Sequence, residues 1–306
     1  MSESAERIRV GRRTITLTHP DKVYFPGRPS ITKRQLADYY AAVAPRMIPL
    51  AKNRPVMLQR FPNGIAAGGF FQKDASDWFP DWIARVAVSK AGGTVTHVLL
   101  NDAATLVYLA GQGCITPHIW LSRADKLQFP DRLIFDLDPP KGFAQAREAA
   151  RLTHHLLDEL SLASALMTTG SRGLHVIVPL DRAADFDTVR SFAWEVANVL
   201  ARRHPDDLTL ETRIAKRQGR LFLDTTRNAY AQTGVAPFAV RARPGAPVAT
   251  PLAWEELDDR KLDSETFRLS NVRRRIEAPD PWRNVMRRKQ SLSRAVQALR
   301  DLIGSE

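Results

Sequence analysis

Two aspartates, Asp136 and Asp138, follow an apolar run and precede two prolines in the segment RLIFDLDPP. In a β-strand, residues two apart project from the same face, so both carboxylates point the same way at a strand end. Two like charges this close are costly unless a cation lies between them. Oxygen ligands suit Mg²⁺ or Mn²⁺ rather than zinc. The pair therefore predicts a divalent metal site.

A single D-x-D match is a weak signal, because about one is expected by chance in a chain of this length. The sequence contains a second match, Asp185-Phe186-Asp187, in polar surroundings just before a predicted helix. Acidic residues at that position favour the helix N-terminus and its cap. We expect this second pair to be structural.

Asp224 ends another apolar strand, in RLFLDTTRN, and is a third carboxylate for a two-metal site. Two divalent ions would lower the pKa of an attacking hydroxyl and neutralise a leaving pyrophosphate. Arg227 and Lys216 add positive charge near Asp224, where a triphosphate would need it.

A turn of small residues in TTGSRGLHVIVPL opens onto a strand. Gly170 and Gly173 allow backbone amides to approach phosphate oxygens closely. Ser171 offers a hydroxyl, while Arg172 and His175 offer charge. Taken alone, His175 is better explained as a buried, hydrogen-bonded core histidine than as a ligand-binding residue.

The elements that position these residues follow from hydrophobic periodicity. Strands alternate with helices from about residue 132 to 243, which indicates a β-α-β-rich α+β fold around a mixed or antiparallel sheet. The strand expected in FAVRAR would place Arg241 and Arg243 on one face. A helix is expected to begin at Ser30, with Ser30 or Thr32 as its cap. The remaining strands are expected at 12–19, 56–61, 84–90, 96–101, 132–138, 174–180 and 220–224, and the remaining helices at 102–113, 144–163, 186–204 and 291–303.

Composition limits the class of protein. The 306 residues are enough for one large domain or two lobes, and 44% apolar with 25% charged residues is typical of a globular chain. A single cysteine, Cys114, excludes an internal disulfide and a four-cysteine zinc site, and a reducing, cytosolic setting is the default. The first residues do not resemble a secretory signal, and no apolar run is long enough for a membrane span.

The net charge of +12, with a pI of about 10.2, suggests a polyanionic partner. From Arg260 onward there are 12 basic and 6 acidic residues, so half of the excess lies in the last 47 positions. A solvated basic surface that serves solubility explains the charge equally well.

Four segments in this order and spacing, FDLDPP, TTGSRGLHV, RLFLD and FAVRAR, resemble the polymerase domain of bacterial ligase D. That domain belongs to the archaeo-eukaryotic primase superfamily and serves non-homologous end joining. The resemblance runs from about Thr16 to Ser291, and its joint pattern is specific. It implies a primase-polymerase fold with two sheets flanked by helices and an RRM-like catalytic part.

The resemblance also assigns roles to residues. It implies that Asp136, Asp138 and Asp224 bind the metals. It places nucleotide contacts at His118, Thr169, Ser171, His175, Arg227 and Arg241. Lys22 and Lys33 match a pocket for a DNA 5′-phosphate, and Phe70 and Phe71 match aromatics that stack on template bases. His19 replaces a common asparagine beside that phosphate pocket, and Ile115-Thr116-Pro117 departs from the family where a glutamate is common.

The implied activity is two-metal addition of ribonucleotides or deoxynucleotides to a primer 3′-hydroxyl at gaps and double-strand breaks. It is templated with some non-templated extension, and Mn²⁺ is preferred. The implied partners are DNA with a 5′-phosphate, nucleoside triphosphates, Ku and a DNA ligase, in the bacterial cytoplasm at the nucleoid.

We expect one catalytic domain over residues 1–290, with lobes at about 1–110 and 111–290, and a helical tail at 291–306.

Two other classes are kept open. A glycosyltransferase could use Asp136 and Asp138 with Mn²⁺, but it would need neither a basic tail nor a second phosphate pocket. A non-catalytic nucleic-acid-binding module would gain nothing from three acids that repel DNA. Salt-sensitive DNA binding and metal-dependent nucleotide binding separate these alternatives.

Overall fold

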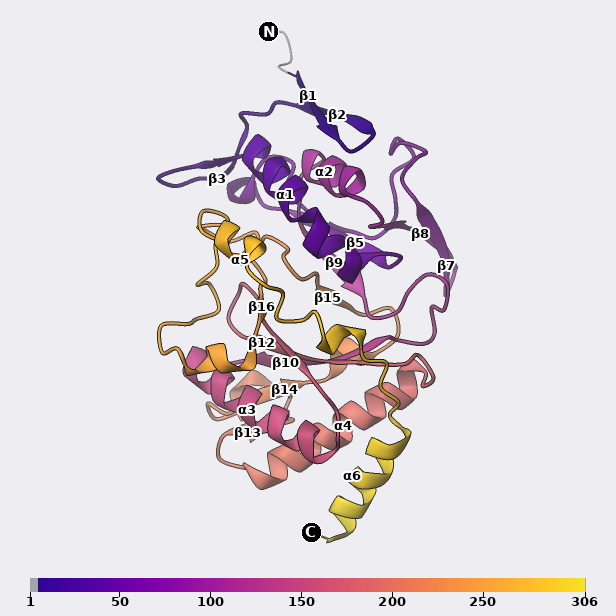
Figure 1. Ribbon diagram of the computed structural model, residues 1–306, viewed down its shortest axis with the longest axis vertical. Coiled ribbons are helices and arrows are strands. Elements are labelled where there is room, and N and C mark those ends of the chain that lie inside the picture. Colours follow the sequence, from indigo (N-terminus) through magenta and orange to yellow (C-terminus); the bar gives the residue numbers. More distant parts are fainter. Residues whose placement is uncertain (1–4, 306) are drawn as a thin grey trace. The chain divides into compact units, whose positions relative to one another are not determined.

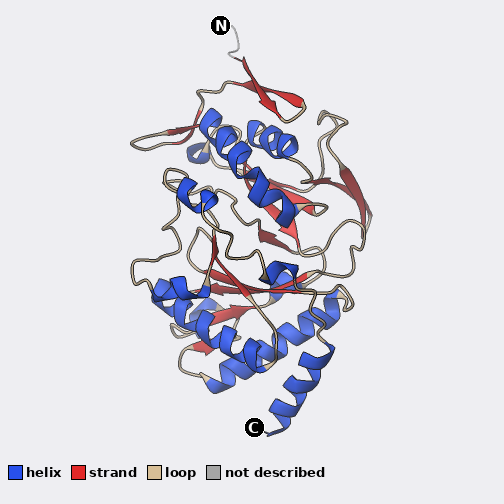
Figure 2. Ribbon diagram, in the orientation of Figure 1, coloured by secondary structure: helices blue, strands red, loops and turns tan. Residues whose placement is uncertain are grey.

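The computed structural model describes residues 5–305, which divide into two compact units. The first unit runs to Trp120 and includes Val235–Ala249 and Phe267–Ala278; the second comprises Leu121–Gly234, Thr250–Thr266 and the chain from Pro279 onward. Neither unit is continuous in sequence, because residues 235–249 and 267–278 belong to the first unit and interrupt the second. Figures 1 and 2 show the helices and strands of each unit.

The first unit is built on a sheet in which β9, β5, β8 and β7 follow one another, with β6 also pairing with β5. Its elements are β1 Ala5–Val10, β2 Arg13–Thr18, β3 Val23–Phe25, β4 Ile31–Thr32, α1 Lys33–Ala51, β5 Pro55–Arg60, η1 Ile65–Ala67, β6 Phe70–Gln72, β7 Arg85–Lys90, β8 Gly93–Leu99, α2 Ala103–Gly111, β9 Cys114–Trp120 and α5 Arg273–Glu277. The α1 and α2 helices pack on each other, and the β1–β2 hairpin contributes Ile15 and Leu17 to a buried cluster with α2.

The second unit is built on a six-stranded sheet in the order β13-β14-β10-β12-β11-β16. Its elements are β10 Arg132–Asp138, α3 Phe143–Glu159, β11 Ala165–Thr168, β12 Leu174–Pro179, α4 Phe186–Arg203, β13 Leu208–Thr209, η2 Ile214–Lys216, β14 Leu221–Asp224, η3 Thr226–Asn228, β16 Pro251–Leu252, η4 Trp254–Asp258, η5 Val285–Arg287 and α6 Ser293–Ser305. The strand β15, Thr233–Val235, contains the point in the sequence at which the division between the two units falls. Among the strand pairs of this sheet in the described part of the chain, β13 and β14 alone run parallel. The expected mixed α+β fold is confirmed.

The central strands of this sheet are apolar because α3 and α4 pack against them. On β10, Leu133, Phe135 and Leu137 are fully buried. They alternate with Asp136 and Asp138, so these aspartates project from the opposite face. The α3 and α4 helices contact each other and lie side by side in Figure 1.

The second D-x-D match is structural, as predicted. The Asp185 side chain caps α4 and accepts a hydrogen bond from the backbone N–H of Thr188 at 2.9 Å. Asp187 lies in the first turn of the helix, where its negative charge interacts favourably with the positive end of the helix dipole.

Two expectations for secondary structure are wrong. The first long helix begins at Lys33 rather than Ser30, because Ile31 and Thr32 pair with β3 before Thr32 caps the helix. Of the two caps considered, Thr32 is the one observed.

The FAVRAR segment is not a strand, so Arg241 and Arg243 do not share a strand face. Phe238 adopts a positive φ of 66°, and Val240 forms only an isolated bridge with Val248. The segment is buried from Phe238 to Val240, which explains why its apolar pattern resembles a strand.

Within residues 5–305, no helix is long and apolar enough to cross a membrane.

Candidate active site

The pairing of β10 with its two neighbours brings together four of the predicted site residues. Asp136 lies directly opposite Asp224 on β14 and directly opposite His175 on β12. Residues directly opposite in antiparallel strands project from the same face, and Asp138 shares that face because it is two positions from Asp136. Three carboxylates and one imidazole therefore occupy one face at the end of three adjacent strands.

Asp136 is the most buried of the three carboxylates, with a side chain 14% exposed. Its two oxygens lie 3.5 Å from Nε2 of His175 and 3.3 Å from Nε of Arg227. Burial alone would raise the pKa of Asp136, but the charges and hydrogen bonds of His175 and Arg227 outweigh it and lower the pKa to about 2. The carboxylate is thus ionised at neutral pH, the form that a metal ligand requires.

The other two carboxylates also accept protein donors. Asp138 pairs with the Arg172 guanidinium. One oxygen of Asp224 accepts hydrogen bonds from the backbone N–H of Thr226 at 2.8 Å and from its hydroxyl at 2.6 Å. Arg172 and Arg227 thus lie against two of the three acids, although the sequence analysis expected Arg227 near Asp224 rather than paired with Asp136.

Across the described part of the chain, no group of three or more His, Cys, Asp or Glu side chains is gathered closely enough to hold a metal ion. The donor set nevertheless fits a hard divalent cation, since the three acids offer oxygen ligands on one sheet face. Arg172 and Arg227 supply the positive charge that otherwise offsets two of these carboxylates.

His175 is 3% exposed, and its Nδ1 has no hydrogen-bond partner among the described residues. Its Nε2 faces Asp136. A buried ring nitrogen without a partner costs free energy unless a ligand completes it. The explanation of His175 as a hydrogen-bonded core histidine therefore accounts for its Nε2 but not for its Nδ1.

The Thr169 side chain helps to hold the turn between β11 and β12. The Thr169 hydroxyl donates to the Gly173 carbonyl at 3.1 Å, and it lies 3.3 Å from the backbone nitrogens of both Ser171 and Gly173. Gly170 has a φ of 62°, which favours glycine. A side chain at Gly173 would overlap the Leu137 carbonyl on β10. These glycines are therefore required for the turn to pack beside the carboxylates.

Asn228, in η3, is a positioning residue that the sequence analysis missed. It is fully buried, and its side chain exchanges two 2.8 Å hydrogen bonds with the backbone of Ile134 and donates to Thr225 at 3.0 Å. It fixes the segment between Asp224 and β10. The one sequence signal was an amide directly after Arg227 in TTRN.

Lys216 does not join this cluster. It is exposed in η2 and forms no ion pair within residues 5–305. His118 and Arg241, both predicted to contact nucleotide, belong to the first unit, whereas the three carboxylates belong to the second.

The first unit carries the predicted aromatic pair. Phe70 and Phe71 on β6 are 49% and 57% exposed, so they are not core residues. Phe71 packs edge-on against the imidazole of His118, with ring centroids 5.9 Å apart. The Arg60 guanidinium lies 5.5 Å from the Phe70 ring and 5.7 Å from the ring of Trp78, which is also exposed. Exposed rings held in place by a buried arginine form a surface suited to stacking.

Lys22 and Lys33 form a second group in the first unit. Lys33 is 6% exposed, and its ammonium donates to the Thr18 carbonyl at 2.7 Å. Burial, and then the nearby charge of Lys22, lower the pKa of Lys33 to about 8. Among the described residues neither lysine pairs with a carboxylate. His19, with a φ of 50°, closes the turn through its carbonyl, which accepts from the Lys22 N–H at 3.1 Å.

Comparison with known proteins decides the family. Residues 32–282 match the family described as the LigD primase-polymerase domain. The chain belongs to this family. The resemblance inferred from the four sequence segments is thereby confirmed, and membership of a polymerase family argues against the glycosyltransferase alternative.

Curated relatives share this LigD domain at moderate identity. The chain is 34% identical over 252 residues to the multifunctional non-homologous end joining protein LigD of Mycolicibacterium smegmatis, covering 81% of this chain and 33% of the relative. It is 32% identical over 298 residues to the LigD protein of Pseudomonas aeruginosa, covering 96% and 35%. The chain thus spans about a third of the length of these relatives.

A solved structure of the family has the same fold. The polymerase domain of Mycobacterium tuberculosis ligase D, determined in complex with DNA, superposes with a TM-score of 0.84 at 32% identity. The match covers 90% of this chain and 99% of that one. The LigD polymerase fold is therefore shared over nearly the whole chain.

Proposed function

We propose that the chain adds nucleotides to the 3′-hydroxyl of DNA at gaps and broken ends during non-homologous end joining. The single observation that carries this proposal is the register that places Asp136 opposite both Asp224 and His175. Family membership supports it, because this arrangement occurs in a chain that belongs to the LigD primase-polymerase domains.

Asp136, Asp138 and Asp224 would hold two divalent ions, Mn²⁺ or Mg²⁺. When bound, these ions neutralise charge on the reacting phosphates and activate the attacking hydroxyl. The protein's own task is positioning and charge compensation. The turn formed by Thr169, Ser171 and Gly173 would present backbone and hydroxyl donors to the triphosphate.

The cations of the site would act on the same substrate. Arg172 and Arg227 pair with Asp138 and Asp136 here, and they would turn toward the triphosphate once metal charge offsets the carboxylates. The Nδ1 of His175, which has no partner among the described residues, would contact a polar group of the nucleotide. His118 and Arg241 are proposed as further nucleotide contacts.

DNA would be held by the first unit. Two lysine ammonium groups without a carboxylate partner suit a 5′-phosphate, and we propose Lys22 and Lys33 for that role, with His19 at the turn. Phe70 and Phe71 would stack on template bases. Ribonucleotides and deoxynucleotides are the proposed substrates, and Ku and a DNA ligase are the proposed partners, the latter because the match covers only about a third of the length of relatives named LigD.

Primer extension by an Asp138→Ala variant tests the proposal. The parent is expected to extend a gapped duplex in the presence of Mn²⁺, and the variant is expected to lose at least about 100-fold in rate. Asp185→Asn is the matched control, because it alters the other D-x-D pair and asparagine caps a helix as well as aspartate does. Equal extension by Asp138→Ala and the parent would overturn the carboxylate mechanism.

A further inference from the structure

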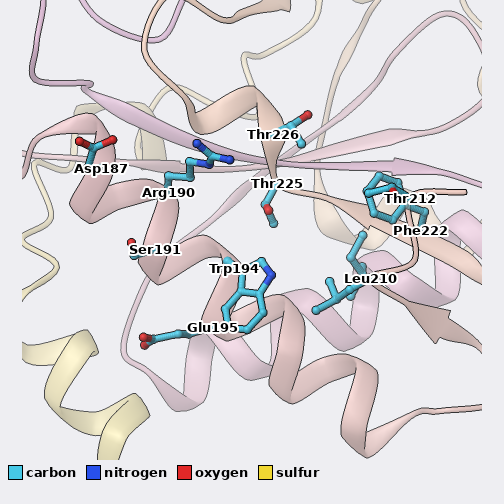
Figure 3. A pocket seen from close by; sticks show the side chains of 11 residues that line it. Asp187, Arg190, Ser191, Trp194, Glu195, Leu210, Thr212, Phe222, Thr225 and Thr226 are labelled. Carbon is cyan, nitrogen blue, oxygen red and sulfur yellow. The ribbon is translucent and has the colours of Figure 1, made fainter.

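A pocket of about 610 Å³ lies in the second unit between the outer side of α4 and the segments around β13 and β14 (Figure 3). Its volume falls within the range of about 300–1,000 Å³ of small-molecule sites. It is open rather than enclosed, and the mechanism described above does not use it. The residues that line it are Asp187, Arg190, Ser191, Trp194, Glu195, Leu210, Thr212, Phe222, Leu223, Thr225 and Thr226.

Trp194 gives the pocket its main apolar surface. Its side chain is 52% exposed on α4, so the indole is accessible to a ligand. Leu210 and Phe222 line the same pocket. Phe222 is itself braced by the Arg217 guanidinium, 4.4 Å from its ring centroid. An exposed indole beside fixed apolar groups suits a flat aromatic ligand.

The charge of the pocket favours a nucleobase over a phosphate. Asp187 and Glu195 are acidic, and Arg190 is the one basic side chain that lines the pocket. In Figure 3 the Arg190 side chain extends from α4 toward Thr225 and Thr226. Carboxylates repel a phosphate but accept hydrogen bonds from the amino and imino groups of a base.

The pocket is directly connected to the catalytic face. Thr226 lines it and also donates both its backbone N–H and its hydroxyl to Asp224. A ligand in the pocket therefore lies beside the segment that fixes the third carboxylate. In the proposed reaction, both the end of the strand that carries the 3′-hydroxyl and the triphosphate of the incoming nucleotide have to reach this carboxylate. Asp187 and Glu195 would repel the triphosphate, which leaves the strand as the occupant of the pocket.

We propose that this pocket binds an unpaired nucleobase of the strand whose 3′ end is extended, with the base stacked on Trp194. The inference rests on the proposed function, since it takes its ligand from that reaction. It adds a site for single-stranded 3′ overhangs that is separate from the aromatic pair Phe70 and Phe71 of the first unit.

Binding of a duplex with a 3′ thymidine overhang tests this, with a single abasic residue placed at each overhang position in turn. An abasic residue removes the base but keeps the phosphate. In the parent, one abasic position is expected to weaken binding about tenfold, the effect of losing one base–aromatic stack. Trp194→Ala is expected to show the same loss with the intact overhang and no further loss with the abasic one. Trp194→Phe is expected to retain most of the affinity and the abasic sensitivity.

Ile214→Ala is the matched control, because Ile214 is 79% exposed in the same unit but does not line the pocket. It is expected to bind as the parent does. If the abasic penalty in Trp194→Ala equals that in the parent, the two losses are additive and the inference is overturned.

The proposed function is tested separately, by filling of a gap whose 3′ strand is fully paired. Trp194→Ala is expected to keep this activity, and its retention shows that the variant is folded. Loss of activity in Asp138→Ala together with an unchanged abasic penalty in Trp194→Ala would overturn the pocket and leave the proposed function intact. An abasic penalty that is present in the parent and absent from Trp194→Ala, with gap filling equal in Asp138→Ala and the parent, would support the pocket and overturn the proposed mechanism.

Discussion

Asp136 on β10 and Asp224 on β14 lie directly opposite each other in an antiparallel pair. Their separation is therefore set by the hydrogen-bonded ladder of the sheet, in which opposite Cβ atoms are about 4.5–5.5 Å apart, and not by a loop. Two carboxylates at such a distance repel each other. A rigid scaffold that holds them together is suited to binding cations between them.

Replacing Asp224 by asparagine keeps its size and removes its charge. The Thr226 N–H and hydroxyl still find an acceptor in the amide oxygen, so the local turn is expected to persist. Nucleotide addition is expected to fall at least about 100-fold in primer extension, because charge on the reacting phosphates is no longer fully compensated. DNA affinity is expected to stay equal or rise, since one repulsive charge is gone. Unchanged extension would remove Asp224 from the metal site.

The titration of Lys33 is expected to make both DNA affinity and protein stability depend on pH, each in a defined direction. Because burial and Lys22 lower its pKa to about 8, Lys33 is mostly protonated at pH 7 and mostly neutral at pH 9. Affinity for 5′-phosphorylated gapped DNA is therefore expected to fall by up to about tenfold per pH unit above 8. The stability of the free protein changes in the opposite direction. The pKa of Lys33 in the folded protein lies below the ordinary lysine value of 10.5, so folding becomes more favourable as the pH rises between the two values.

The control for this titration is the same gapped DNA with a 5′-hydroxyl, measured by fluorescence anisotropy at each pH. Its affinity is expected to depend little on pH between 7 and 9. Lys22→Ala removes the neighbouring positive charge, so the fall in affinity for phosphorylated DNA is expected to move to higher pH. An equal fall for both DNAs would assign the titration to another group.

The second unit could be predicted from the sequence because its strands and helices differ clearly in period. The strand before Asp136 and Asp138, the strand after the Gly170 turn and the strand before Asp224 are all observed where expected. Their order in the sheet was not readable, because no local pattern specifies that β10 lies between β12 and β14. The convergence of the acids depends on that order.

Two errors have a common physical cause. The strand β9, which carries His118, was not predicted, since Gly113 precedes it and Pro117 lies within it, and proline is rare inside sheets. The strand predicted in FAVRAR is a buried loop that is apolar for tertiary reasons. In both places burial, and not local propensity, decides the composition.

Gly173→Ala tests whether the turn beside the carboxylates needs a glycine. A methyl group there would overlap the Leu137 carbonyl, and the backbone of a central strand has little freedom to move. We expect a loss of about 2–3 kcal/mol in the free energy of unfolding, measured in urea, together with loss of extension activity. Gly304→Ala in α6 is the control, because no atom lies within 4 Å of the added methyl group. A neutral Gly173→Ala would show that β10 and β12 separate readily.

Asn228→Ala tests the connection between η3 and β10. Removing this side chain leaves the N–H and carbonyl of Ile134 without their partners in a fully buried position. Each such group costs about 1–3 kcal/mol, so the free energy of unfolding is expected to fall by about 2–4 kcal/mol. Because Asp224 and Arg227 lie on the released segment, kcat/KM is also expected to fall by up to about 100-fold at a temperature where the variant stays folded.

Asn198→Ala on α4 is the control, because the Asn198 side chain makes no hydrogen bond within residues 5–305. It is expected to change the free energy of unfolding by less than about 0.5 kcal/mol. A variant of Asn228 that lost stability but kept full kcat/KM would show that Asn228 supports the fold without positioning the site.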